Sequence, residues 1–464
     1  MKPGIELAGK HVLVVGLART GVATALFCAA RGAHVTATEE RPESQLAETA
    51  AKLRAAGVTL ELGGHGSQTF VDQDLIVPSP GVSPMLPALA AARSLGIPVW
   101  SEIELAWRFL RGRLVCITGS NGKTTTTSLV GHILETAGLP VQVAGNIGTP
   151  LISRVDVSSD SGFTVVEASS FQLESISSFH PDIAVLLNLT QDHLDRHGSF
   201  EAYGRAKIRM FENQTEVDAA VLNADDAEVA QLAPSRPQVY WFSRNKRIAS
   251  GCFLRNDEIV FRRDGAETVL LQRTDIGLRG NHNVENVLAA AAAATLAGVE
   301  PGAIAEGVRS FAGVEHRIEF VAAISGVEYF NDSKATNVDA TLKALDAFPG
   351  NVLVILGGKD KGCDYAILRD ALKRHARMAL LIGSAADKIE EQLGGAVPIE
   401  RAGTIARAVE IAAQRAVPGD TVLLAPACAS FDQFESYEHR GRVFKQLVRE
   451  LAEKNAAGEP ARKA

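Results

Sequence analysis

The stretch 114–127, which reads LVCITGSNGKTTTT, constrains the fold more than any other part of the chain. The apolar run 114–117 predicts a buried strand, and the apolar positions within 128–137 predict a helix. A glycine turn lies between them and ends in Lys123 and Thr124. Glycines let backbone N–H groups close around phosphate oxygens, and the N-terminus of the next helix adds partial positive charge. The stretch therefore predicts a strand–loop–helix unit that binds the phosphates of a nucleotide.

The loop is shorter than the general nucleotide-binding motif G-x-x-x-x-G-K-[ST], because only Ser120 and Asn121 separate Gly119 from Gly122. We expect Lys123 to reach the outer phosphates and the Thr124 hydroxyl to bind Mg²⁺. The alternative interpretation is a turn that caps a helix and binds no ligand.

The composition limits the classes of function. A length of 464 residues favours about two to four domains. The net charge of −7 leaves no basic surplus to neutralise phosphates, so no nucleic acid is expected as a partner. The five cysteines are scattered and are predicted to be reduced. No apolar run reaches the length of a membrane span, and 1–16 lacks the features of a signal peptide. We therefore expect a cytoplasmic protein without a membrane partner.

The first domain is predicted to cover 1–111 and to be Rossmann-like. A strand at 11–16 precedes the turn GLARTG and a helix, and a second strand at 33–38 ends in two glutamates. Ala18 replaces the middle glycine of G-x-G-x-x-G, so we favour a nucleotide other than NAD or FAD, with a structural turn as the alternative. A third strand, 74–78, runs into a Pro-Gly turn at the edge where open α/β sheets bind ligands.

The second domain is predicted to cover 112–312 and to contain a parallel sheet. The apolar runs 141–144, 163–167 and 183–188 each end in polar residues, which should converge on one edge of the sheet. Glu167 ends a buried strand, and we favour a magnesium ligand there over a solvated acid.

Three further segments complete this domain. The segment QDHLDRH, which begins at Gln191, could hold a second metal or could be a polar surface loop. A helix is expected over 200–211 and carries Lys207, short alternating runs over 239–271 predict a small β meander, and Gly280 to Asn283 should cap an alanine-rich helix.

The third domain is predicted to cover 313–464. Paired strands are expected at 317–321 and 327–330, followed by three more strands separated by helices. Three of these strands end in NDSKATN, GGKDKG and PACAS. The end of the chain, 455–464, is predicted to be disordered. The fold class is therefore α/β with three domains. A Rossmann-like N-terminal domain precedes a central P-loop ATPase-type parallel sheet with a small β extension, and a C-terminal Rossmann-like domain follows.

With these motifs laid out, the chain resembles the Mur ligase family nearly from end to end. The shared segments are TGSNGKTTTT, GNIG, EASSFQLE, NLTQDHLDRHGS, GNHNVEN, EHR, NDSKATN, GGKDKG and PACASFDQFE. The resemblance implies an amide ligase of bacterial cell-wall synthesis that acts on a UDP-linked sugar-peptide. NDSKATN, PACASFDQFE and EASSFQLE are similar to the branch that adds D-glutamate to UDP-N-acetylmuramoyl-L-alanine, using ATP and an acyl-phosphate intermediate.

The resemblance also implies a role for individual residues. The implied catalytic residues are Lys123, Glu167, His193 and Lys207. The implied ATP contacts are Gly119, Ser120, Asn121, Gly122, Lys123, Thr124, Thr125, Asn281, Arg317 and Asp332. Two Mg²⁺ sites are implied, with ligands from Thr124, Glu167, His193 and a carbamylated Lys207. The UDP-linked substrate would meet Arg19, Thr20, Glu39, Glu40, Arg41, Gly81 and Asn146. D-glutamate would meet Lys334, Thr336, Lys361 and Ser430, with Lys359 as the alternative to Lys361.

Three rival interpretations remain beside this one. The first is another ATP-dependent amide ligase, which the NDSKATN segment disfavours. The second is a catalytically silent nucleotide-binding regulator, whose signature would be the loss of the implied catalytic residues. The third is a nicotinamide dehydrogenase, which Ala18 disfavours. For a ligase with substrates on three domains, we expect a monomer whose third domain closes, with hinges near Arg111 and Gly313.

Overall fold

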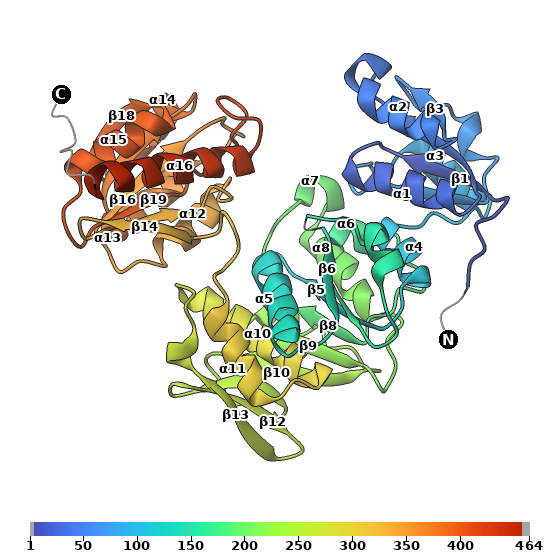
Figure 1. Ribbon diagram of the computed structural model, residues 1–464, viewed down its shortest axis with the longest axis horizontal. Coiled ribbons are helices and arrows are strands. Elements are labelled where there is room, and N and C mark those ends of the chain that lie inside the picture. The colour runs from blue at the N-terminus through green and yellow to red at the C-terminus, as the bar shows by residue number, and fades with distance from the viewer. Residues whose placement is uncertain (1–3, 147, 457–464) are drawn as a thin grey trace. The chain divides into compact units, whose positions relative to one another are not determined.

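The computed structural model describes residues 4–146 and 148–456, and its strands within those ranges form three sheets of four, nine and six strands. The chain divides into two compact units. Unit 1 comprises Met1–Gly277 and Val284–Phe311, and unit 2 comprises Leu278–Asn283 and Ala312–Ala464. Two of the sheets belong to unit 1 and the third to unit 2 (Figure 1). Each unit is described by itself.

The first sheet is parallel throughout. Its strands, in spatial order, are β3 (Thr59–Leu62), β2 (His34–Glu39), β1 (His11–Val15) and β4 (Leu75–Pro78). The helices that accompany it are α1 (Arg19–Ala30), α2 (Ala47–Ala55) and α3 (Pro87–Ser94), and α4 (Glu102–Phe109) follows. Because β1 lies between β2 and β4, the turns after these three strands share one edge of the sheet.

The second sheet is parallel from β6 to β11 and antiparallel beyond. Its strands, in spatial order, are β13 (Ala266–Gln272), β12 (Glu258–Arg263), β11 (Gly251–Arg255), β10 (Gln238–Ser243), β9 (Ala219–Asn223), β8 (Ile183–Leu186), β5 (Arg113–Thr118), β7 (Phe163–Glu167) and β6 (Val141–Gly145). The prediction of a meander over 239–271 is therefore wrong at its start. β10 pairs in parallel with β9 and β11, and only β11, β12 and β13 form the antiparallel meander.

Both faces of the second sheet are covered by helices. Val115 and Ile117 of β5 face one core, which includes side chains of α5 (Lys123–Thr136), α10 (Asn281–Ala297) and α11 (Pro301–Ser310). Leu114 and Cys116 face the opposite core. The helical segments that contribute to this second core or lie near it are η3 (Leu151–Val157), α6 (Ser170–Leu173), α7 (Leu194–His197), α8 (Phe200–Ile208), η4 (Arg209–Phe211) and α9 (Ala227–Ala230). β5 lies between β8 and β7 and is parallel to both, so the loop after β5 is flanked by the ends of these two strands.

Helix α5 begins at Lys123, earlier than the apolar pattern over 128–137 predicts. Its first turns carry Thr124 to Thr127, and all four side chains are buried. Hydrophobic periodicity misses this part of the helix because the buried face is lined by hydroxyl-bearing residues.

The third sheet is parallel except at one edge. Its strands, in spatial order, are β14 (Glu319–Ile324), β15 (Val327–Asn331), β19 (Thr421–Leu424), β16 (Val352–Gly357), β17 (Ala376–Ile382) and β18 (Ile399–Gly403), and only β14 is antiparallel. The accompanying helices are α12 (Val338–Leu345), α13 (Arg369–His375), α14 (Ala386–Leu393), α15 (Ile405–Arg415) and α16 (Tyr437–Ala456). β19 lies between β15 and β16, so NDSKATN, PACAS and GGKDKG follow three adjacent strands.

The fold class is confirmed: the chain has three α/β domains, each built around one of the three sheets. At the end of the chain, 455 and 456 belong to α16 instead of a disordered tail, and the rest of that predicted segment lies outside the described residues. No helix of residues 4–146 or 148–456 combines the length and apolar character needed to cross a membrane.

Candidate active site

The predicted phosphate loop, which comprises 118–124, has the backbone geometry that its two glycines permit. Gly122 precedes α5 with φ of 81°, in the left-handed region, and a Cβ there would collide with Oδ1 of Asn286 on α10. Gly119 has φ of 154°, and its Cβ would lie 2.9 Å from the Cβ of Leu187. Close packing on both sides explains why the short loop carries glycine at these two positions.

The segment that follows β8 holds the loop through hydrogen bonds. The Asn188 side chain accepts a hydrogen bond from the Asn121 N–H at 2.8 Å and donates one to the Asn121 carbonyl at 3.1 Å. Ser120 Oγ accepts from the Thr190 N–H at 2.9 Å and lies 3.0 Å from the Tyr203 hydroxyl. Tyr203 is buried, and sequence reasoning missed it. These hydrogen bonds fix the backbone conformation of the loop at Ser120 and Asn121.

The Nζ atoms of two lysines converge on the same carbonyl of the loop. Lys123 Nζ donates to the carbonyls of Gly119 and Ser120 at 2.8 Å each, and Lys207 Nζ donates to the Gly119 carbonyl at 2.8 Å. The Lys207 side chain comes from α8 and is only 1% exposed. Burial, together with the positive charge of Lys123, holds the pKa of Lys207 well below its ordinary value. A lowered pKa favours the neutral form of the Lys207 amine, which is its reactive form.

Glu167 presents one unsatisfied carboxylate oxygen at the end of β7. The residue is 2% exposed, and its Oε1 accepts from Asn146 Nδ2 at 2.8 Å. Its Oε2 is buried and makes no hydrogen bond to any residue that the structure describes. A buried carboxylate oxygen without a donor is costly unless a cation neutralises it, and oxygen is the ligand that Mg²⁺ prefers. Glu167 therefore fits a magnesium ligand.

His193 lies in the segment that joins β8 to α8. Its backbone is left-handed with φ of 51°, its ring is half exposed, and the ring meets Phe171 edge-on at 4.9 Å between centroids. Within the described ranges, no three side chains of His, Cys, Asp or Glu gather as a metal site. The second metal site stays a prediction, because its expected ligands include the modified form of Lys207.

The predicted site residues of the first sheet lie at one edge of it. Some of their side chains are engaged in contacts within the protein, and others are exposed. Glu39 Oε2 accepts from the Leu17 N–H at 2.7 Å and from Arg41 at 3.0 Å. The Arg41 guanidinium is the main reason that the pKa of Glu39 falls to about 2. The carboxylate of Glu40 is exposed, and Arg19 Nη1 donates to the Gly148 carbonyl at 2.6 Å. Thr20 lies in the first turn of α1, which follows β1, and Gly81 lies in the turn after β4.

In unit 2, the polar ends of three adjacent strands lie together. Asp332 follows β15, and its burial raises its pKa to about 7 against the opposing charge of Arg317. The Ala427 N–H donates to the Ala335 carbonyl at 2.9 Å, and the Lys359 N–H donates to the Ala429 carbonyl at 2.9 Å. Lys334, Thr336, Lys361 and Ser430 belong to these joined segments, and Asn281 begins α10. Lys361 is exposed, whereas Ser430 is buried.

Arg440 holds two of these strand ends together, and sequence reasoning missed it. The side chain enters from α16, is fully buried and donates to the Ser333 carbonyl at 2.8 Å and the Cys428 carbonyl at 3.2 Å. Burial lowers its pKa to about 10. An arginine on the inward face of an amphipathic helix is the signal that could have revealed it, because charged residues are rarely buried there.

Comparison with known proteins agrees with this arrangement. Family models match 10–101 (Mur ligase MurD-like, N-terminal domain), 117–294 (Mur ligase middle domain) and 316–428 (Mur ligase, glutamate ligase domain). The UDP-N-acetylmuramoylalanine–D-glutamate ligase of Koribacter versatilis is 53% identical over 97% of this chain and 99% of that protein. The protein of the same name from Acidobacterium capsulatum is 55% identical over 98% of both chains.

A solved structure shares the fold. It is the UDP-N-acetylmuramate–alanine ligase MurC of Thermotoga maritima, with 19% identity, a TM-score of 0.60 and coverage of 95% of this chain and 100% of that one.

Proposed function

Because the chain belongs to the Mur ligase family, we propose that it joins D-glutamate to UDP-N-acetylmuramoyl-L-alanine and converts ATP to ADP and phosphate. The observation that carries the proposal is the identity of more than half of all aligned residues, over nearly the full length, with ligases of that name. The product would be a cytoplasmic precursor of peptidoglycan. The five cysteines, all free thiols among the described residues, support a reducing compartment.

The chemistry follows from the properties of a carboxylate. A carboxylate resists attack by an amine, because oxide is a poor leaving group. In the proposed first step, an oxygen of the substrate carboxylate attacks the γ-phosphorus of ATP, and the bond to ADP breaks. In the second step, the amine of D-glutamate attacks the acyl carbon of the resulting acyl phosphate and loses a proton. The tetrahedral intermediate then expels phosphate and leaves the amide.

Lys123 would position the transferred phosphoryl group. Its ammonium group lies against the Gly119 and Ser120 carbonyls, at the mouth of the loop whose backbone would bind the phosphates. We propose the same contact role for the other loop residues from Gly119 to Thr125. Mg²⁺ would be held by the Thr124 hydroxyl and Glu167, where it would offset the repulsion among the anionic groups. A second Mg²⁺ is proposed beside His193.

We propose that Lys207 reacts with CO₂ to form a carbamate. The neutral Nζ forms a bond to the carbon of CO₂ and releases one proton, so that a neutral amine becomes an anionic carbamate whose oxygens can bind a metal. The lowered pKa and the burial of Lys207 support this step. Enzyme equilibrated with ¹³C-bicarbonate should show a carbamate carbon signal by NMR that Lys207→Ala and Lys207→Arg both lack. The same signal in all three proteins would contradict the modification.

The remaining sites are proposed on the same basis. Asn281, Arg317 and Asp332 would contact the adenosine of ATP. The UDP-linked substrate would lie along the edge of the first sheet, and Asn146 would meet its sugar while orienting Glu167. Lys334, Thr336, Lys361 and Ser430 would bind D-glutamate, whose two carboxylates suit the lysines. The proposed domains are 1–111, 112–312 and 313–464, and the proposed state is a monomer.

Phosphate release tests the proposal. The assay contains ATP, Mg²⁺ and UDP-N-acetylmuramoyl-L-alanine, with D-glutamate, L-glutamate, L-alanine or no amino acid. Release only with D-glutamate, abolished in Lys123→Ala, is the expected result. Turnover with another amino acid would keep the ligase mechanism and overturn the assignment of the third domain. No release under any condition would favour a silent nucleotide-binding protein.

A further inference from the structure

Arg196 joins the turn after β4 to the segment that carries His193, and neither its contacts nor its role follows from the sequence motifs. We propose that Arg196 is a positioning residue that fixes the UDP-substrate edge of the first sheet relative to the phosphate loop. This inference rests on the proposed function. It assigns to Arg196 a role in substrate placement without contact to the reacting atoms.

One guanidinium holds two carbonyls of the same turn. Arg196 Nη1 donates to the carbonyls of Pro80 and Val82 at 3.0 Å each. These carbonyls flank Gly81, which lies in the turn proposed to meet the UDP-linked substrate. Two acceptors on one planar donor group restrict both the position and the tilt of the turn, a constraint that a single hydrogen bond does not impose.

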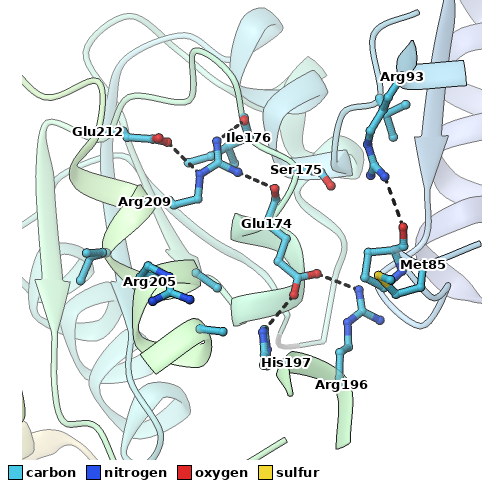
Figure 2. A pocket seen from close by; sticks show the side chains of 15 residues that line it. Met85, Arg93, Glu174, Ser175, Ile176, Arg196, His197, Arg205, Arg209 and Glu212 are labelled. Carbon is cyan, nitrogen blue, oxygen red and sulfur yellow. Dashed lines mark hydrogen bonds and ion pairs between the residues drawn. The ribbon is translucent and has the colours of Figure 1, made fainter. Parts of the chain in front are cut away.

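The opposite side of the guanidinium is anchored in the second domain. Arg196 Nη2 donates to Glu174 Oε2 at 3.0 Å, and Nδ1 of His197 lies 3.0 Å from Glu174 Oε1, as Figure 2 shows. His197 Nε2 lies 3.0 Å from Ser170 Oγ. An ionised carboxylate only accepts hydrogen bonds, so Nδ1 of His197 is the donor in this contact. Glu174 is thus shared by two donors, and it is itself only 19% exposed.

Arg196 is also linked to His193, the proposed metal ligand, through the Phe171 ring. The Arg196 guanidinium carbon lies 4.1 Å from the centroid of the Phe171 ring, and His193 meets that ring edge-on. Both residues belong to one tight segment, because the N–H of Arg196 donates to the His193 carbonyl at 3.1 Å. A displacement of Arg196 would therefore move the substrate turn and His193 together.

Removal of the guanidinium should change catalysis in a selective way. Arg196→Ala is expected to raise KM for UDP-N-acetylmuramoyl-L-alanine and to lower kcat, each by roughly 10-fold or more, because reacting groups that are misplaced by about 1 Å react far more slowly. KM for ATP should stay within about twofold, because the phosphate loop is held by other contacts. Arg196→Lys should recover only part of the loss. A lysine ammonium can keep the ion pair with Glu174, but it cannot also donate to the carbonyls of both Pro80 and Val82.

Arg31→Ala is the matched control. Arg31 lies at the end of α1 and pairs with Asp156 of η3, so it also joins the first sheet region to the second domain, but it contacts no carbonyl of the 79–82 turn. Its variant should keep all kinetic constants within about twofold of the wild type. Equal effects in both variants would overturn the inference in favour of general destabilisation.

Amide hydrogen exchange provides a readout that needs no activity. Val82 N–H donates to the Ser79 carbonyl at 2.9 Å, inside the turn that Arg196 holds. Arg196→Ala should speed exchange in 79–83 by roughly 10-fold or more, with no change in 148–156. Unchanged exchange in 79–83 of Arg196→Ala would overturn the inference, whether or not the wild type turns over substrate. Failure of the wild type to turn over substrate would count against the proposed function alone. Glu174→Gln, which keeps the shape of the anchor, should give a smaller increase in the same segment.

Discussion

Glu102 and Glu104 lie two positions apart in α4, are both buried, and differ in how their charge is satisfied. Glu104 Oε2 accepts hydrogen bonds from the N–H groups of Ser177, Ser178 and Phe179 at 2.7–2.9 Å, and its Oε1 pairs with Arg108. Glu102 Oε1 accepts from the Ile152 N–H at 2.6 Å, but its Oε2 makes no hydrogen bond to any described residue. Burial raises the pKa of Glu102 from 4.5 to about 7.

This difference predicts a pH-dependent stability that Glu102→Gln removes. Below about pH 4.5 Glu102 is protonated in both the folded and unfolded states, and its contribution is fully present. As the pH rises toward 7, the unfolded chain ionises first, and stability falls by up to roughly 3 kcal/mol. Urea denaturation from pH 5 to 8 should show a flatter profile for Glu102→Gln than for the wild type, and identical slopes would contradict the prediction.

Glu104→Gln is the control for that experiment. Gln replaces a carboxyl group whose oxygens accept from three N–H groups and an arginine, so the variant should be less stable than the wild type at pH 7 by roughly 3 kcal/mol. A Glu104→Gln protein as stable as the wild type at pH 7 would show that these hydrogen bonds contribute little.

The residue scale also shows what sequence reasoning identified. Lys123 and Glu167 stand at or after strand ends, and their position and chemistry suggested a phosphate and metal site. Lys207 was singled out only through the resemblance to a known family. Tyr203, Arg440 and Arg196 were missed. Each acts through contacts with residues distant in the chain, and no spacing rule brings those partners together.

At the scale of elements, α11 packs tightly on α5 through a glycine. A Cβ at Gly307 would lie 2.9 Å from the Cα of Ile133, so the two helices approach more closely than a side chain at this position allows. Gly302 belongs to the same helix, and a Cβ there would meet nothing within 4 Å. A substitution at Gly307 therefore tests helix packing, and a substitution at Gly302 tests helix propensity alone.

Gly307→Ala and Gly302→Ala should therefore change stability in opposite directions. Alanine favours a helix over glycine by up to about 1 kcal/mol, which Gly302→Ala should gain in part. At Gly307 the backbone of α5 must shift, and overpacking of this kind costs roughly 1–3 kcal/mol. Thermal unfolding monitored by circular dichroism measures both variants, and equal midpoints would show that the helices separate freely.

The elements themselves followed mostly from hydrophobic patterns. Long apolar runs such as β5, β7 and β16 were predicted with small errors at their ends. β3 and β18 were missed, because these short edge strands carry too few apolar residues to show a period. β9 was also missed, although it is as long and as buried as β7. The parallel pairing of β10 was also beyond the sequence, since strand direction depends on the connection through space.

At the scale of the whole molecule, the proposed mechanism requires domain closure. ATP, the UDP-linked substrate and D-glutamate are proposed to be held by three domains, and their reacting atoms must come within bonding distance. Small-angle scattering should show a smaller radius of gyration with a non-hydrolysable ATP analogue, the UDP-linked substrate and D-glutamate than without ligands. Hinges are expected near Arg111 and Gly313.

Lys123→Ala provides the control for the scattering experiment. A protein that binds nucleotide phosphates poorly should not respond to the same mixture, while its ligand-free profile should match the wild type. Superimposable wild-type profiles with and without ligands would contradict the predicted closure.

The sequence by itself determined most of the strands and helices, the residues of the predicted phosphate loop and the polar ends of three strands in the third domain. These features depend on residues close together in the chain, so their patterns can be recognised without knowledge of the fold. Only the tertiary structure decided that Glu104 is satisfied and Glu102 is not, that Lys207 is buried beside Lys123, and that Arg196 reaches Pro80 across 116 positions of chain. Burial, orphaned polar atoms and shifted pKa values arise when distant segments pack, so no local pattern encodes them.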